Sequence, residues 1–161
     1  MKKLIYLLVS LLIQQALFSQ PRLQNGIYLV EQDKSNSIIS TGQNKVTVPL
    51  NPFFFEGDPD SYKPITVFSN EFVPFKLTAT PVVQRNEYGG SRVLVHLADS
   101  AVELLKGFTT KYFMRQVAVI VDNQAIAVYK IYQPISSGLI KITDCNGSAC
   151  NQVSRQLKLA L

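Results

Sequence analysis

The sequence predicts an α+β fold, with a mixed or antiparallel sheet and two helices packed on one face of it. Three observations favour this fold class. Segments with strand-like alternation of apolar residues are separated by turn residues. Two further segments carry apolar residues at helical spacing, in the order strand, strand, helix, three strands, helix. Charged residues make up only 17% of the chain, which is typical of a folded domain and not of a disordered one.

The N-terminus predicts an export signal. Lys2 and Lys3 precede an apolar run at residues 4–13, and Ser19 offers a small residue for cleavage before Gln20. The run is shorter than the roughly 20 residues of a membrane span. We therefore expect a signal peptide at residues 1–19 and a periplasmic or secreted mature chain that meets the membrane only during export. An uncleaved membrane anchor is the alternative, and the lack of a nearby cysteine excludes a lipoprotein.

Residues 20–74 are predicted to form an N-terminal region of strands and loops. Residues 26–30 and 45–50 alternate like short strands, and the polar stretch between them reads as a loop or a loose hairpin. Residues 51–70 contain three prolines and an acidic turn at residues 56–60. The remaining residues, 75–161, are predicted to form the main domain.

Aromatic residues supply the candidate binding surface. Phe53, Phe54 and Phe55 are consecutive, and they either belong to the core or line a surface that holds apolar peptide. Tyr129, near the end of a predicted strand, is a fourth candidate for contact with a peptide or partner.

The alternation of apolar residues is clearer after residue 75. We predict strands at residues 75–83 and 92–97, the second with Val93, Val95 and Leu97 on one face.

A helix is predicted to follow, opened by Asp99 and Ser100. Ser100 and Glu103 match a capping box, in which each satisfies an unpaired backbone N–H. Gly107 indicates close packing of this helix against a neighbour. The apolar stripe of the helix has five members: Ala101, Leu104, Leu105, Phe108 and Tyr112.

Three strands and a second helix complete the predicted order. Residues 117–121 are apolar on both faces, as in an interior strand, and Asp122 with Asn123 suits a hairpin turn into the strand at 125–131. The last elements are a turn at 134–138, a strand at 139–143 and a helix capped by Ser148, with Cys150, Val153, Leu157 and Leu161 on one face.

Cys145 and Cys150 are the only cysteines. In an exported protein two cysteines at this spacing more often form a disulfide than a metal site or a reactive thiol, so we predict a disulfide. A loop this short contributes about 2 kcal/mol by the chain-entropy relation. Free thiols are the alternative. No metal site is predicted, because zinc needs further ligands and His96 is the only histidine.

Several function classes find no support in the residues. The formal charge of +5 includes no run of Lys or Arg to follow a phosphate backbone, which argues against nucleic-acid binding. No serine-hydrolase elbow, zinc-protease pair or phosphate loop is present, so we predict no catalytic residues, no enzyme activity and no cofactor.

A run of motifs in the C-terminal half matches a known family. An apolar strand leads to a helix with a Phe and a Thr, then a strand that ends in a hairpin turn, and later a Pro-Ile-x-x-Gly turn before a closing strand. The matching positions are Phe108, Thr110, Arg115, Ala118, Ile120, Val121, Asp122, Pro134, Ile135, Ser137, Gly138 and Ile142. By these motifs residues 91–143 resemble the head subdomain in the first periplasmic domain of SecDF, the accessory membrane protein of bacterial protein export.

Two positions depart from the family pattern. Asn123 stands where the family has the Gly of an Asp-Gly turn, and Tyr129 stands where it has the Pro of Ser-Ala-Pro. The resemblance implies a SecDF-head-like fold for residues 75–161 and contact with unfolded or exported chains. It does not imply proton-driven translocation, because the membrane helices of SecDF have no counterpart here.

The function expected from residues and resemblance together is non-catalytic binding of polypeptide or of an envelope or export-related protein. The alternative is a structural module of the cell envelope that recognises one specific folded partner. Binding of a small ligand or glycan would rest on exposed aromatics alone. It is also open that every apolar residue named belongs to the core.

Overall fold

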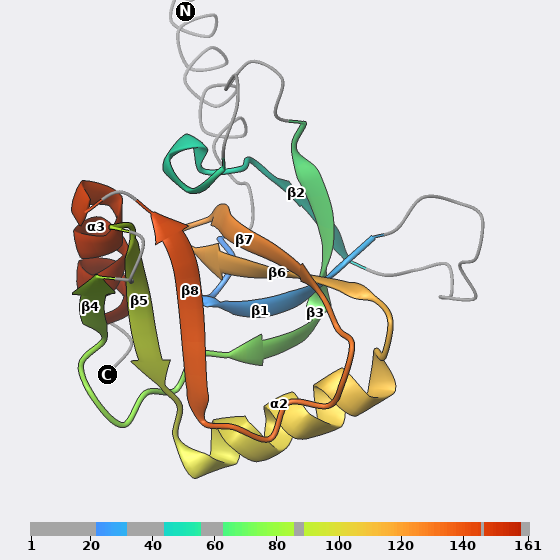
Figure 1. Ribbon diagram of the computed structural model, residues 1–161. Helices are drawn as coiled ribbons and strands as arrows, with labels where there is room; N and C mark the ends of the chain where they lie inside the picture. The colour runs from blue at the N-terminus through green and yellow to red at the C-terminus, as the bar shows by residue number, and fades with distance from the viewer. Residues whose placement is uncertain (1–21, 32–43, 56–62, 86–88, 146, 159–161) are drawn as a thin grey trace, which may run out of the picture.

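The computed structural model describes residues 22–31, 44–55, 63–85, 89–145 and 147–158, whose arrangement is shown in Figure 1. The predicted signal peptide and its cleavage site lie outside these ranges, as does Leu161 of the predicted final helix face.

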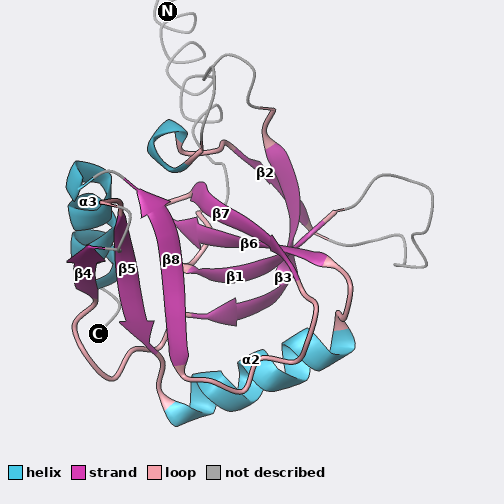
Figure 2. Ribbon diagram, viewed as in Figure 1, coloured by secondary structure: helices cyan, strands magenta, loops and turns pink. Residues whose placement is uncertain are grey.

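The described strands form two antiparallel sheets (Figure 2). The larger sheet has the strand order β2-β3-β1-β6-β7, and the smaller has the order β4-β5-β8. The bounds of the strands are β1 Gly26–Val30, β2 Lys45–Val48, β3 Ile65–Pro74, β4 Val82–Arg85, β5 Ser91–His96, β6 Gln116–Val121, β7 Gln124–Lys130 and β8 Leu139–Cys145. The helices are η1, a 3₁₀ turn at Pro52–Phe54, α2 at Asp99–Lys111 and α3 at Gly147–Lys158.

The predicted α+β class is confirmed, and both long helices pack into one core. Leu105 of α2 and Val153 of α3 belong to the same buried cluster as Ile27 of β1 and Val119 of β6. Val93 of β5 joins this cluster from the smaller sheet. α2 packs against β3 of the larger sheet and α3 packs chiefly against β4 and β5 of the smaller sheet, and both helices bury their apolar faces in the core that the two sheets share.

The N-terminal region and the main domain share this core. β1, from the predicted region 20–74, lies between β3 and β6 in the larger sheet, and all five of its residues are buried. β6 and β7 belong to the predicted domain 75–161. The described parts of the two regions thus form one sheet and one folded unit.

The opposite face of the larger sheet carries a second, smaller buried cluster. At its centre Tyr28 stacks on Phe72 of β3, with ring centroids 4.7 Å apart and planes 6° from parallel. The Tyr28 hydroxyl donates a 2.7 Å hydrogen bond to the carbonyl oxygen of Gln24. This bond satisfies a phenol that would otherwise be buried without a partner.

The strand predicted at residues 75–83 is wrong except for its last two residues, and a strand for which no element was predicted precedes it. β3 begins at Ile65 and ends at Pro74, and the chain pairs again in β4 from Val82. Polar residues at 69–71 interrupt the apolar alternation of β3, beside an irregularity in its pairing with β1, and so conceal the strand. Between β3 and β4 only Leu77 makes an isolated bridge, to Leu97.

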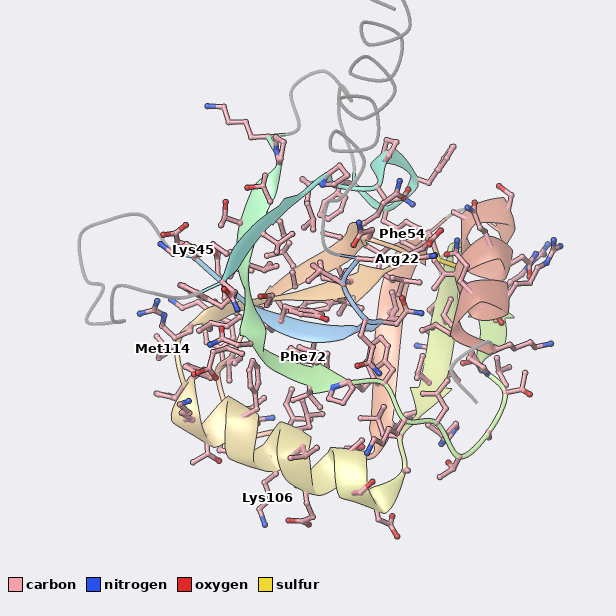
Figure 3. The ribbon with its side chains drawn as sticks, turned by 180° about the vertical axis from the view of Figure 1, so that it is seen from behind. Arg22, Lys45, Phe54, Phe72, Lys106 and Met114 are labelled. Atoms are coloured by element: carbon pink, nitrogen blue, oxygen red, sulfur yellow. A yellow bond between two sulfur atoms is a disulfide. The ribbon has the colours of Figure 1, made fainter. Side chains whose placement is uncertain are left out.

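Three details predicted for the first helix are also wrong. α2 starts at Asp99 after Ala98, without a side-chain capping bond, so Ser100 and Glu103 form no capping box. A Cβ on Gly107 would meet nothing within 4 Å, so close packing does not explain this glycine. Leu104 is 52% exposed and so lies off the buried stripe of α2. Figure 3 shows Lys106 of the same helix pointing away from the sheet.

The predicted disulfide between Cys145 and Cys150 is confirmed, with Cα atoms 5.6 Å apart. Both cysteines are buried. The bond joins the end of β8 to the first turn of α3, and so ties this helix to the smaller sheet.

The buried phenol of Tyr28 predicts a specific loss of stability in alkali. Burial raises the pKa of Tyr28 to about 12, whereas an unfolded tyrosine titrates near pH 10. The contribution of this group is therefore fully present below about pH 10 and is lost as the pH rises towards about 12. Between about pH 9 and 11 the parent protein should lose about 1 kcal/mol more of its free energy of unfolding than a Tyr28→Phe variant.

The measurement is urea denaturation of both proteins across that pH range. Loss of the hydroxyl lowers the free energy of unfolding of the variant by a similar amount at every pH. The test therefore compares how steeply the free energy of unfolding of each protein falls as the pH rises. Parallel curves for the two proteins would contradict the assignment.

Candidate functional site

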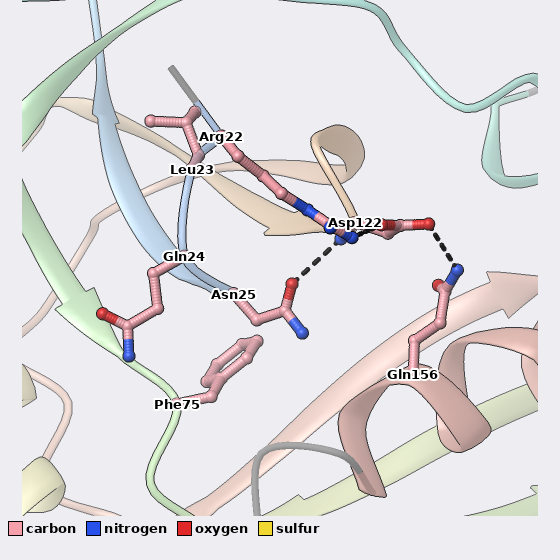
Figure 4. A pocket seen from close by; sticks show the side chains of 7 residues that line it. All are labelled: Arg22, Leu23, Gln24, Asn25, Phe75, Asp122 and Gln156. Atoms are coloured by element: carbon pink, nitrogen blue, oxygen red, sulfur yellow. Dashed lines mark hydrogen bonds and ion pairs between the residues drawn. The ribbon is translucent and has the colours of Figure 1, made fainter. Parts of the chain in front are cut away.

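One hollow on the described surface surrounds the hairpin turn at Asp122. This hollow has a volume of about 440 Å³ and is shown in Figure 4. Its lining residues are Arg22, Leu23, Gln24, Asn25, Phe75, Asp122 and Gln156. Asp122 pairs with Arg22 at 2.8 Å and accepts a hydrogen bond from Gln156 of α3 through its other carboxylate oxygen.

The predicted turn at Asp122 and Asn123 is confirmed. Both residues have positive φ, 50° and 64°, as a tight two-residue hairpin between β6 and β7 requires. The Asp122 backbone N–H donates to the Asn25 side chain, and Asn123 accepts from the N–H of Leu23. The carboxylate and N–H of Asp122 and the side-chain oxygen of Asn123 thus hold neighbouring parts of the chain together, which indicates a structural role for the hollow.

A second hollow, which we call the β7–β8 groove, has a volume of about 390 Å³. This lies within the range of about 300–1,000 Å³ that is common for ligand pockets. Its lining residues come from β1, α2, β6, β7, β8 and the connection between β7 and β8, elements that can be followed in Figure 1. Its lining residues are Ile27, Leu105, Thr109, Val117, Val119, Tyr129, Lys130, Ile131, Tyr132, Gln133, Ile135, Leu139, Ile140 and Lys141.

The floor of the groove is apolar and the rim is aromatic and basic. Ile27, Val117 and Val119 supply the floor from the core face of the sheet. Tyr129 and Tyr132 are 40% and 69% exposed at the rim. No acidic side chain is among the lining residues, and the two charged ones are lysines. The groove therefore suits an apolar ligand with polar or negative edges.

One wall of the groove is the free edge of β8. Leu97 donates its N–H to the carbonyl oxygen of Gly138, which fixes the register of β8 on β5. Because hydrogen-bonded and non-hydrogen-bonded pairs alternate, Ile140 bonds towards β5 while the backbone groups of Leu139 and Lys141 point away from it. The N–H of Leu139 donates to Ser137 Oγ at 3.1 Å, whereas no described strand pairs with the N–H or C=O of Lys141.

The segment that joins β7 to β8, residues 131–138, is held against α2 by a buried threonine. Thr109 is 1% exposed, and its hydroxyl donates to the Leu105 carbonyl at 2.8 Å and accepts the N–H of Ile135 at 2.9 Å. At the far end of the segment, a Cβ on Gly138 would approach Val102 at 3.2 Å. These contacts hold the connection along α2, beside the groove.

The four candidate aromatic residues lie in different places. Phe53 is 57% exposed at η1, Phe54 is buried in the core and Phe55 packs on the edge of the core. Only Tyr129 lines the β7–β8 groove. Leu50, beside η1, pairs with residue 125 at the opposite end of β7, so the structure does not gather the phenylalanines and Tyr129 into one surface. Phe54, being core, offers no contact surface.

The motif positions have mostly structural roles. Phe108 is buried in α2, Thr110 bonds its own helix through the Lys106 carbonyl, and Asp122 makes the hairpin. Arg115 follows α2, and its Nε is buried without a hydrogen-bond partner among the described residues. Pro134, Ile135 and Gly138 belong to the segment that connects β7 to β8, where Ile135 lines the groove.

Sequence reasoning missed Thr109, Tyr132 and the free edge at Lys141. Thr109 was open to prediction, since it lies four residues after Leu105 and eight after Ala101 on the buried stripe of α2. The exposure of Tyr132 and the free edge of β8 have no local sequence signal, because both depend on which strands pair.

The described residues contain no group of three or more His, Cys, Asp or Glu side chains placed to hold a metal ion. Among them there is also no helix with the length and apolar character to cross a membrane.

Comparisons with known proteins find similarity at the level of fold. No protein-family model matches the sequence, and no curated protein matches it. A crystal structure of SecDF in a super-membrane-facing form is similar with a TM-score of 0.45 and 17% identity, over 53% of this chain and 11% of that one. A structure of SecDF described as a membrane component that enhances protein export is similar with a TM-score of 0.47 and 12% identity, over 85% of this chain and 63% of that one.

Both structures are of SecDF, the protein that the sequence resemblance names. The present chain spans less than two thirds of either SecDF chain. The similarity is one of fold, and the chemistry of the groove comes from the residues of this chain.

The bond from Ile135 to Thr109 predicts that a single isosteric change loosens one side of the groove. Thr109→Val keeps the shape of the side chain but removes the acceptor, so we expect the free energy of unfolding to fall by about 1 kcal/mol. The Ile135 amide should also exchange with solvent faster. Thr110→Val is the matched control, because its exposed hydroxyl bonds only its own helix. Equal exchange of the Ile135 amide in all three proteins would show that the bond does not hold this segment.

Proposed function

We propose that this chain is a non-catalytic, extracytoplasmic domain that binds polypeptide as an extended segment on the free edge of β8. The observation that carries the proposal is the position of this edge, which borders an apolar groove instead of open solvent. An extended peptide can add to an open sheet edge through main-chain hydrogen bonds, while pockets beside the edge receive alternate side chains.

The edge and the groove are complementary in chemistry. The edge offers the N–H and C=O of Lys141 and the C=O of Leu139, which suit any polypeptide backbone. The groove offers the aliphatic floor around Val117 and Val119, and burial of apolar side chains there would contribute about 25 cal/mol per Å². Backbone bonding with apolar burial favours unfolded or extended chains that carry apolar side chains at alternate positions.

A catalytic role fits the groove poorly. Among the described lining residues there is no carboxylate, histidine, cysteine or serine that would act as acid, base or nucleophile. The resemblance to the SecDF head is consistent with polypeptide handling during export. A periplasmic or secreted location and cleavage of residues 1–19 belong to the same proposal, and they rest on the N-terminal pattern of the sequence.

The proposal is tested by a variant that removes one edge donor and leaves the β5–β8 ladder intact. Proline at position 141 lacks the N–H that points away from β5, and edge strands accept proline at such positions. We expect Lys141→Pro to keep its cooperative unfolding transition and to lose at least about tenfold in affinity for extended peptides from a broad library, equivalent to about 1.4 kcal/mol.

Lys141→Ala is the matched control, because it removes the same side chain and keeps the N–H. It should lose only what the side chain contributes and bind peptides clearly more tightly than Lys141→Pro. Equal binding by the proline and alanine variants would exclude addition to the edge of β8. Failure of the parent to bind any peptide, together with stoichiometric recovery of one folded protein in crosslinking experiments, would instead favour an envelope module with a single dedicated partner.

A further inference from the structure

The two faces of a strand added to β8 would meet different surroundings. Side chains of β8 alternate, with Ile140 and Ile142 on the core side and Lys141 on the other side of the smaller sheet. An added strand continues this alternation. Its residues on the core side would enter the apolar groove, and those between them would lie on the same side as Lys141.

Lys141 would then have a direct cross-strand neighbour. On the smaller sheet Lys141 pairs with Leu94, and Leu94 pairs with Val82, whose side chain is largely exposed. Lys141 itself is exposed and takes part in none of the ion pairs found between described residues. A residue opposite it on an added strand would have its Cβ about 4.5–5.5 Å from that of Lys141.

A second lysine lies at the rim of the same groove. Lys130, at the end of β7, lines the groove and places its Nζ 5.7 Å from the centroid of the Tyr132 ring. It too is exposed and takes part in none of those ion pairs. With a lysine on either side of the added strand and no acidic residue among the described lining residues, the surroundings of that strand are complementary to negative charge.

We infer that the β7–β8 groove selects extended segments in which an acidic residue stands between two apolar residues. The inference rests on the proposed addition of a polypeptide to the edge of β8 and names the class of segment that this site takes. The two apolar side chains enter the groove, and the acidic side chain between them pairs with Lys141. A basic residue at that position meets a like charge directly opposite, which is unfavourable.

The experiment compares three nine-residue peptides that alternate apolar and polar residues and differ only in the central residue, Glu, Gln or Lys. Binding of each fluorescein-labelled peptide to the purified protein is measured by anisotropy at low salt. The expected order of affinity is Glu, then Gln, then Lys, with Glu at least about threefold tighter than Lys. High salt should reduce the difference, because the pair is exposed.

Charge reversal at the lysine provides the second arm. Lys141→Glu should invert the order, so that the Lys peptide binds best. Lys63→Glu is the matched control, since Lys63 is an exposed residue just before β3, on the side of the larger sheet that ends at β2, and it should leave the order unchanged. Unfolding curves of both variants check that the fold is kept.

The outcomes separate the inference from the function on which it rests. Equal affinity for the three peptides, or an order that Lys141→Glu does not change, overturns the acidic preference and leaves polypeptide binding standing. Absence of binding for all three peptides and for the broad library overturns both. Inversion of the order of affinity by Lys141→Glu, but not by Lys63→Glu, supports pairing of Lys141 with the central acidic residue of the peptide.

Discussion

The fold depends on the insertion of β1 between β3 and β6. β1 hydrogen-bonds to both neighbours, and its alternate side chains enter the two buried clusters on either face of the larger sheet. At its first residue, Gly26, a Cβ would lie 2.5 Å from the carbonyl oxygen of Val73, so a larger residue would force the strands apart. Without β1 the larger sheet would lose its continuity, and the floor of the groove would lose Ile27.

The groove follows from the way the two sheets end. β7 is the last strand of the larger sheet and β8 is the last strand of the smaller one, and the connection between them is held along α2. Among the described residues, β7 and β8 belong to different sheets and do not pair with each other. Edge strands usually carry charged residues or other features that discourage unwanted pairing. Lys130 and Lys141 are charged residues of this kind at the two edges, and the inferred preference for an acidic partner strand rests on Lys141.

Much of the fold was predictable from local patterns. β1, β5 and β6 carry uninterrupted apolar alternation or fully apolar runs, and the Asp122-Asn123 turn has the side chains that tolerate positive φ. β3 was not predictable in this way, because its polar middle looks like a loop and becomes a strand through pairing with β1 and β2 on either side. Tertiary pairing thus overrode local pattern in that segment.

The candidate site was predictable only in part. Tyr129 has the aromatic character expected of a binding surface, and the structure places it at the groove. Phe54 has the same character and is buried, because composition does not distinguish a core aromatic residue from a surface one. The free edge at Lys141 depends on which strand remains unpaired, and that is a property of the whole topology.

Hydrogen exchange of two neighbouring amides tests the central claim most directly. The N–H of Ile140 points towards β5 and that of Lys141 points away, so the free protein should protect Ile140 and leave Lys141 in fast exchange. If an extended peptide adds to β8, exchange at Lys141 should slow while that at Ile140 changes little. If the peptide binds and Lys141 still exchanges fast, with protection gained at Lys130 of β7 or at neither edge, then β8 is not where this protein receives a polypeptide.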